Sequence, residues 1–98
     1  MTITTESRGV KHLIKVNGAF DYSIEDSFRQ AYEKMPRNTD FLIDFSEVES
    51  MDSTALTMLL SFRDYAGGEN SFIELVDCNP KIFSVLEVSN FHELFKIS

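Results

Sequence analysis

Two adjacent hydroxyl groups, on Ser53 and Thr54, follow Asp52 at the start of a strongly apolar stretch. Side chains of these three types are preferred where a helix begins, because their oxygens accept hydrogen bonds from the free backbone N–H groups of the first turn. Those N–H groups carry partial positive charge and favour an anion, including a phosphate attached to serine or threonine. The segment therefore predicts either a simple helix cap or a hydroxyl that is modified.

Three aspartates, Asp21, Asp44 and Asp52, lie near predicted strand ends or helix starts and could form an acidic metal pocket like that of a receiver domain. A receiver also needs a phosphoacceptor aspartate at the end of a strand and a suitably placed lysine. The sequence offers no convincing candidate for that lysine. Solvated capping carboxylates are the favoured interpretation. His12 and His92 lack the spacing of metal ligands, so neither a metal site nor a cofactor is predicted.

Charge and composition disfavour direct binding to nucleic acid and to anionic membrane. The 98 residues contain 16 acidic and nine basic side chains, which gives a net charge of −7 and no basic cluster of the kind that binds nucleic acid or anionic membrane. No apolar run approaches the roughly 20 residues that span a bilayer, and the first residues do not resemble a signal peptide. Cys78 is the single cysteine and cannot form an internal disulfide. We expect one cytoplasmic domain over residues 1–98.

The elements that position the hydroxyls follow from periodicity. Strands alternate with amphipathic helices, a pattern that favours an α/β layer with mostly parallel pairing. The predicted elements are strands at 2–6 and 10–18, a helix at 23–35, a strand at 41–45, a helix at 53–66, a strand at 71–76, a short helix opened by Asn79 and Pro80, and an edge strand within 92–98. The first two strands are expected to form a hairpin. The predicted domain therefore has three helices and a mixed, mostly parallel sheet of about four to five strands.

Local signals set the predicted ends. Residues 6–9 read as a turn, and residues 18–21 are expected to break the second strand. Ser23, three residues before Asp26, predicts a weak capping box. The nearly continuous apolar strand 41–45 predicts burial on both faces, and a loop over residues 46–52 is expected to lead into the helix that begins at Ser53.

The stretch "DFSEVESMDSTALTMLL" resembles the central signature of STAS domains of the anti-sigma factor antagonist type. In that family an apolar strand ends in Asp, and Asp-Ser-Ser/Thr-Gly-Leu then opens a helix. "GAFDYS" is similar to the family's Gly-x-Leu-Asp, and "NPKIFSVLEVSNFHELFKI" to its third helix and last strand. The resemblance covers nearly the whole chain in the expected order and implies a single STAS-like domain without catalytic activity.

The resemblance implies a phosphorylation switch at Ser53, with Thr54 as the alternative acceptor. A serine kinase that is also an anti-sigma factor would bind the unphosphorylated form, and a serine phosphatase would restore that form, with no contact to DNA. The implied partner surface comprises Asp21, Tyr22, Ser23, Asp52, Ser53, Thr54, Ala55 and Thr57. Some small STAS proteins instead bind the ATPase of a lipid-transporting ABC complex, and this accessory-subunit role remains the alternative.

Two departures from the family pattern affect these expectations. Ala55 and Thr57 stand where the family often has glycine, so the start of the helix is more crowded. The sequence stops at Ser98, and the family's usual final helix is expected to be absent. A homodimer that covers the surface left by that helix is one alternative to an uncovered core.

Overall fold

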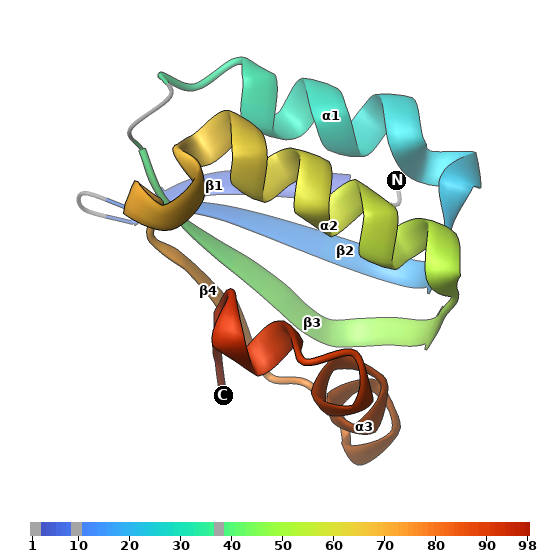
Figure 1. Cartoon of the computed structure of the whole chain (residues 1–98). Coiled ribbons are helices and arrows are strands. Elements are labelled where there is room, and N and C mark those ends of the chain that lie inside the picture. The colour runs from blue at the N-terminus through green and yellow to red at the C-terminus, as the bar shows by residue number, and fades with distance from the viewer. Residues whose placement is uncertain (1–2, 9–10, 37–38) are drawn as a thin grey trace.

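Five strands form one mixed sheet and three helices pack against it in the computed structural model, which describes residues 3–8, 11–36 and 39–98 (Figure 1). The strands are β1 (Ile3–Arg8), β2 (Lys11–Phe20), β3 (Asp40–Met51), β4 (Ile73–Val76) and β5 (Lys96–Ile97). The helices are α1 (Glu25–Glu33), α2 (Ser53–Ala66) and α3 (Pro80–Val88), and the shorter 3-10 turns are η1 (Tyr22–Ile24), η2 (Gly68–Asn70) and η3 (Phe91–Glu93). The predicted α/β class with a mostly parallel sheet is confirmed.

The order of the strands explains how the helices cover the sheet. The sheet runs β1-β2-β3-β4-β5, with β1 antiparallel to β2 and every later neighbour parallel. Each crossover steps in the same direction, and right-handed crossovers are nearly universal, so α1, α2 and α3 belong on one face. On β3, Phe41, Ile43 and Phe45 are fully buried under the helices, whereas Leu42 and Asp44 on the opposite face are only half-buried. The prediction that this strand is covered on both faces is wrong.

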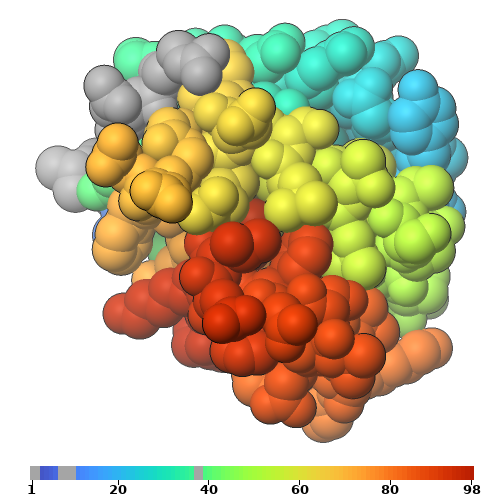
Figure 2. Space-filling model, in the orientation of Figure 1, coloured from blue at the N-terminus to red at the C-terminus, as the bar shows by residue number. Residues whose placement is uncertain are grey.

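Aromatic side chains fill much of the space between the sheet and the helices. The ring of Phe62 on α2 lies 5.5 Å from Phe28 and 4.7 Å from Tyr32 on α1, and 4.9 Å from Phe41 on β3, measured between ring centroids. Tilted and edge-on ring pairs at these distances are favourable contacts. They hold α2 between α1 and the sheet, and Figure 2 shows α2 between α1 and the C-terminal segment on one face of the molecule.

The two central strands are longer than the sequence predicts. Gly18, which has a positive φ of 81°, lies beside a shift in register, and β2 nevertheless continues to Phe20. Strand β3 continues to Met51, which pairs with Phe20. The predicted break at residues 18–21 and the predicted loop at 46–52 are therefore wrong, because hydrogen bonds between the strands extend both of them. As a consequence, Asp21 and Asp52 leave the sheet from neighbouring positions.

The other boundaries agree in part with the predictions. Strand β1 runs to Arg8, so residues 6–8 belong to the hairpin and not to the predicted turn, and residue 9 lies outside the described residues. The helix predicted at 23–35 begins as η1 at Tyr22 and becomes α-helical at Glu25–Glu33. The bounds of α2 match the prediction at both ends, and Asn79 caps α3 as expected. Among the described residues no helix is long and apolar enough to cross a membrane.

Candidate functional site

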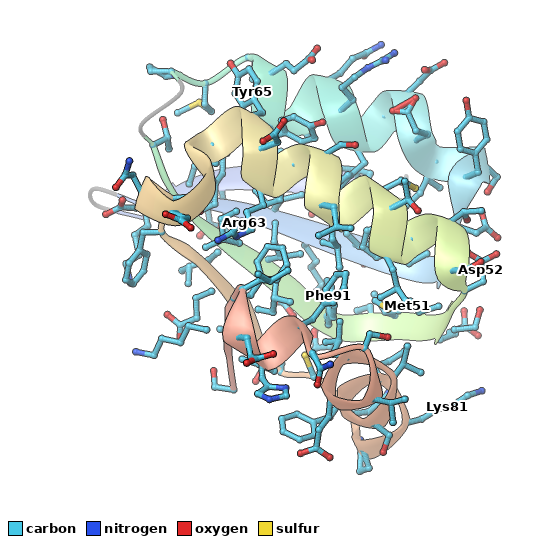
Figure 3. The ribbon with its side chains drawn as sticks, viewed as in Figure 1. Met51, Asp52, Arg63, Tyr65, Lys81 and Phe91 are labelled. Atoms are coloured by element: carbon cyan, nitrogen blue, oxygen red, sulfur yellow. The ribbon has the colours of Figure 1, made fainter. Side chains whose placement is uncertain are left out.

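Asp21 and Asp52 each cap a helical segment where β2 and β3 end. Asp21 Oδ1 accepts hydrogen bonds from the backbone N–H of Ser23 at 2.9 Å and from its hydroxyl. Asp52 Oδ1 accepts from the backbone N–H groups of Thr54 at 2.9 Å and Ala55 at 3.2 Å, at the start of α2 (Figure 3). The capping box expected at Ser23 is thus replaced by an Asp21 cap. The two caps share the pattern Asp-x-Ser/Thr, which is a sequence signal for their equivalence.

The hydroxyl of Thr54 ties these two turns together. It donates a hydrogen bond to Asp52 Oδ1 at 2.5 Å and accepts one from the backbone N–H of Tyr22 at 3.0 Å. The hydrogen bond from Thr54, together with the backbone N–H groups of Ala55 and Thr54, holds the pKa of Asp52 below its usual value. Asp52 is therefore ionised at neutral pH, and the Thr54 hydroxyl is engaged both as donor and as acceptor.

Ser53 differs from its neighbour. It is the first residue of α2, it is exposed, and its hydroxyl makes no hydrogen bond within residues 3–8, 11–36 and 39–98. Its carbonyl accepts a hydrogen bond of 3.3 Å from the hydroxyl of Thr57, one turn along the helix. A modifying protein therefore has access to the Ser53 hydroxyl without first breaking a contact that the described residues provide.

The other predicted partner residues mostly surround Ser53 on the surface. Tyr22 is 68% exposed, Ser23 and Thr57 are exposed, and Asp21 is half-buried. Ala55 is different, because it is 0% exposed and belongs to the core cluster. Its methyl group fills part of the core at a position where the family often has glycine. Ala55 is therefore not accessible to a partner and does not belong to the predicted partner surface.

A groove between α1 and α2, which the sequence did not reveal, opens beside this site. It has a volume of about 350 Å³, and its apolar lining includes Phe28, Tyr32 and Met58, while Tyr22 and Thr54 also line it. Burial raises the pKa of Tyr32 to about 12, so this side chain is neutral at physiological pH. Helical periodicity identifies the apolar faces, but the space between two helices depends on how they pack and has no signal in the sequence.

The other side chains that could bind a metal or react, among them Asp44 and Cys78, make local contacts or are partly buried. Within the ranges that the structure describes, no three His, Cys, Asp or Glu side chains form a group that could hold a metal ion. Asp44 Oδ1 accepts from the backbone N–H of Ser46 at 2.8 Å, which is a local contact within β3. Burial, with a smaller contribution from the charge of Asp77, raises the pKa of Cys78 to about 11. Its thiol is therefore protonated at neutral pH and is a poor nucleophile.

Comparison with known proteins finds a matching family model and a related protein. The family model described as "Mlab, STAS domain" matches residues 3–96. A STAS-domain containing protein from Pseudomonas aeruginosa (strain UCBPP-PA14) is 41% identical over 101 residues, which cover 100% of this chain and 98% of that protein.

Two solved structures share the fold. An anti-sigma factor antagonist from Mycobacterium paratuberculosis has a TM-score of 0.81 at 20% identity, over 98% of this chain and 83% of that chain. The anti-sigma factor antagonist SpoIIAA in its unphosphorylated form has a TM-score of 0.75 at 15% identity, over 98% and 86% of the two chains. At these identities the likeness concerns the fold.

Proposed function

This chain belongs to the STAS domain family described as "Mlab, STAS domain", and we propose that it acts there as an anti-sigma factor antagonist switched by phosphorylation of Ser53. The unphosphorylated protein would bind a serine kinase that also serves as the anti-sigma factor, in the cytoplasm. Phosphorylation by that kinase would end the complex, and a serine phosphatase would restore binding. The role requires no catalysis by this chain and no cofactor.

The exposed Ser53 hydroxyl carries the proposal. The hydroxyl of Thr54 is held between Asp52 and Tyr22, and a phosphate on it would remove the proton donated to Asp52 and place a second negative charge beside that carboxylate. Ser53 is exposed at the first position of α2, where the free N–H groups of the first turn favour an anion. The contrast between the two neighbouring hydroxyls supports Ser53 as the acceptor and gives Thr54 a structural role.

A phosphate at Ser53 changes binding more than folding. The helix dipole stabilises an exposed anion at this position by only about 0.3–1 kcal/mol. The neighbouring carboxylate of Asp52 repels the phosphate, so the two effects within the chain partly cancel. At an interface the phosphate adds about 1.5 to 2 negative charges that a partner would have to desolvate, and every 1.4 kcal/mol of that cost is a tenfold loss of affinity. The proposed switch therefore blocks docking while the domain stays folded.

Mass spectrometry of the protein isolated from its host provides the direct test. Intact mass should show a phosphorylated fraction, and peptide mapping of residues 44–63 should place the phosphate on Ser53. The Ser53→Ala variant should lose the modification, while Thr54→Ser, which keeps the tying hydroxyl, should retain it. A phosphate found on Thr54, or none under conditions where the partner kinase is active, would contradict the proposal.

A second measurement separates blocked docking from unfolding. Backbone NMR shifts of Ser53→Asp should change only around the start of α2, whereas partner affinity should fall. Global unfolding of this variant would contradict the proposed mechanism. Because Asp carries about one charge where phosphoserine carries nearly two, protein phosphorylated by the kinase should show the larger loss of affinity.

The accessory-subunit role on the ATPase of a lipid-transporting ABC complex makes the opposite prediction for Ser53. An assembly contact of that kind needs no acceptor hydroxyl, so Ser53→Ala would leave both the complex and its function unchanged. Recovery of an ABC ATPase in place of a kinase, together with a silent Ser53→Ala variant, would favour this role. A complex that Ser53→Ala locks in the bound state would favour the switch.

A further inference from the structure

The groove between α1 and α2 opens next to the proposed phosphorylation site. Its lining includes side chains of Phe28, Tyr32 and Met58 that are 1%, 4% and 6% exposed, so they belong mainly to the core and turn only a small part of their surface to the opening. Tyr22 is 68% exposed and lines the same groove. With a volume of about 350 Å³, the groove lies near the lower end of the range of ligand pockets, about 300–1,000 Å³.

The position of the groove is fixed relative to Ser53. Thr54 lines the groove directly after Ser53, and Thr57 lines it one helical turn later. The hydrogen bond between the Thr54 hydroxyl and the backbone N–H of Tyr22 holds the two walls together at this end. A protein that places its active site over Ser53 therefore covers the groove as well.

The charges around the opening indicate which kind of partner side chain would fit the groove. Glu25 and Arg29 line the groove, and Arg29 pairs with Glu25 at 3.7 Å and with Asp26 at 3.0 Å. Asp52 accepts a hydrogen bond from the lining Thr54, and Asp21 directly precedes the lining Tyr22. Glu25 thus lines the opening itself, three further carboxylates are bonded to or adjacent to residues that line it, and the guanidinium that lines it is already ion-paired. An apolar interior with an acidic rim is complementary to an apolar side chain accompanied by a cation.

We propose that this groove is a docking site for the partner kinase, which inserts an apolar side chain carried next to a lysine or arginine. The inference rests on the proposed function for the identity of the partner and extends it to the chemistry of the contact. Tyr22 is an anchor of this site, since exposed tyrosines contribute large contact area at interfaces. The cation of the partner pairs with the carboxylates at the rim.

Short peptides test the groove without knowledge of the kinase. The full-length, ¹⁵N-labelled protein is titrated with acetyl-Arg-Phe-Arg-amide, and acetyl-Glu-Phe-Glu-amide serves as the probe of opposite charge. We expect saturable shifts of amides in α1, η1 and the first half of α2, with the basic peptide bound about tenfold more tightly, a ratio that corresponds to 1.4 kcal/mol. Added salt should reduce this ratio, because the rim is exposed.

Two matched variants locate the binding. Ser61→Trp places an indole at the groove, and Ser84→Trp makes the same substitution on the exposed side of α3. Ser61→Trp should weaken the basic peptide about tenfold, while Ser84→Trp should leave its affinity unchanged. Circular dichroism of both variants confirms that they fold, and Tyr22→Ala, which removes an exposed side chain, provides an independent blocking variant if Ser61→Trp does not fold.

Several outcomes would overturn the docking site. These are equal affinity for the two peptides, shifts scattered over the sheet, and no effect of either blocking variant. Groove shifts that depend on protein concentration without any peptide would place a second copy of the chain there instead. Failure of the peptide test with phosphate still found on Ser53 would remove only this inference, whereas peptide binding without phosphorylation would remove the switch.

Discussion

Replacement of Thr54 by valine should loosen the link between the two capped turns without disturbing the core. Valine has nearly the shape of threonine and is also β-branched, so the substitution removes mainly the hydroxyl. The variant loses the hydrogen bonds to Asp52 and from the Tyr22 N–H, each worth about 0.5–1.5 kcal/mol in proteins. Because Thr54 is exposed and water can replace part of both contacts, we expect a loss of about 1 kcal/mol in the free energy of unfolding.

Thermal unfolding and hydrogen exchange measure the two parts of this prediction. A loss of about 1 kcal/mol should lower the Tm by about 4–8 °C in a domain of this size. The Tyr22 amide should exchange faster, while the Ile24 amide, which donates to the Asp21 carbonyl at 3.2 Å, should be much less affected. Thr57→Val is the matched control, since its hydroxyl only reaches the Ser53 carbonyl. Equal stability of the two valine variants and an unchanged Tyr22 exchange rate would show that the Thr54 hydroxyl does not link the two turns.

Three further predictions concern the core, a helix end and acid stability. Leu59→Ala should cost about 2–5 kcal/mol in urea unfolding because Leu59 is 0% exposed, whereas Leu60→Ala, at a position 44% exposed, should cost much less. Gly67→Ala should lower the free energy of unfolding by about 1–3 kcal/mol, since Gly67 ends α2 with a φ of 125° that alanine rarely adopts. Burial, with a smaller contribution from Lys34, lowers the pKa of His12, so the unfolded chain binds a proton at higher pH than the folded one. Stability should therefore fall as the pH drops from about 7.5 to about 5.5, and His12→Leu should flatten that dependence.

Each of these predictions has its own contradicting result. Equal losses for Leu59→Ala and Leu60→Ala would mean that the burial of α2 differs from the structure described. A Gly67→Ala variant as stable as the wild type would show that the helix end relaxes without strain. An unchanged pH dependence in His12→Leu would assign the acid sensitivity of that range to another group.

The sequence predicted α2 at both ends because its signals are local. The apolar periodicity gives the helix, the Asp52 carboxylate caps its first turn, and Gly67 supplies the positive φ that ends it. The ends of the central strands were not predictable in the same way. Gly18 looks like a strand breaker by itself, but its strand continues because β3 provides hydrogen-bond partners as far as Met51. The end of a strand depends on both paired strands, and the local sequence of β2 does not contain the length of β3.

In the candidate site, too, the local motif was predictable, whereas the contacts between distant segments were not. The motif favoured Ser53 as the acceptor, with Thr54 as the alternative, but it could not show which hydroxyl is engaged in hydrogen bonds. That distinction depends on the bond between Thr54 and Tyr22, which are 32 positions apart in the sequence. The bond exists because Phe20 pairs with Met51, so the chain leaves both strands at neighbouring points. The register of two parallel strands thus decides which hydroxyl is engaged and which stays available.

The acidic surroundings of Ser53 constrain how a phosphate there could release a cationic partner. Asp21, Asp52 and the exposed Glu49 already make this end of the sheet negative, so a phosphate increases the long-range attraction for a basic surface. Repulsion at a distance therefore cannot explain release. The phosphate must act at contact, where it occupies space and keeps water that the interface would have to remove. Phosphorylation should accordingly raise the dissociation rate, while salt should mainly slow association. The same separation follows from the geometry, because the groove proposed to attract the cation and the hydroxyl proposed to carry the switch are adjacent but distinct.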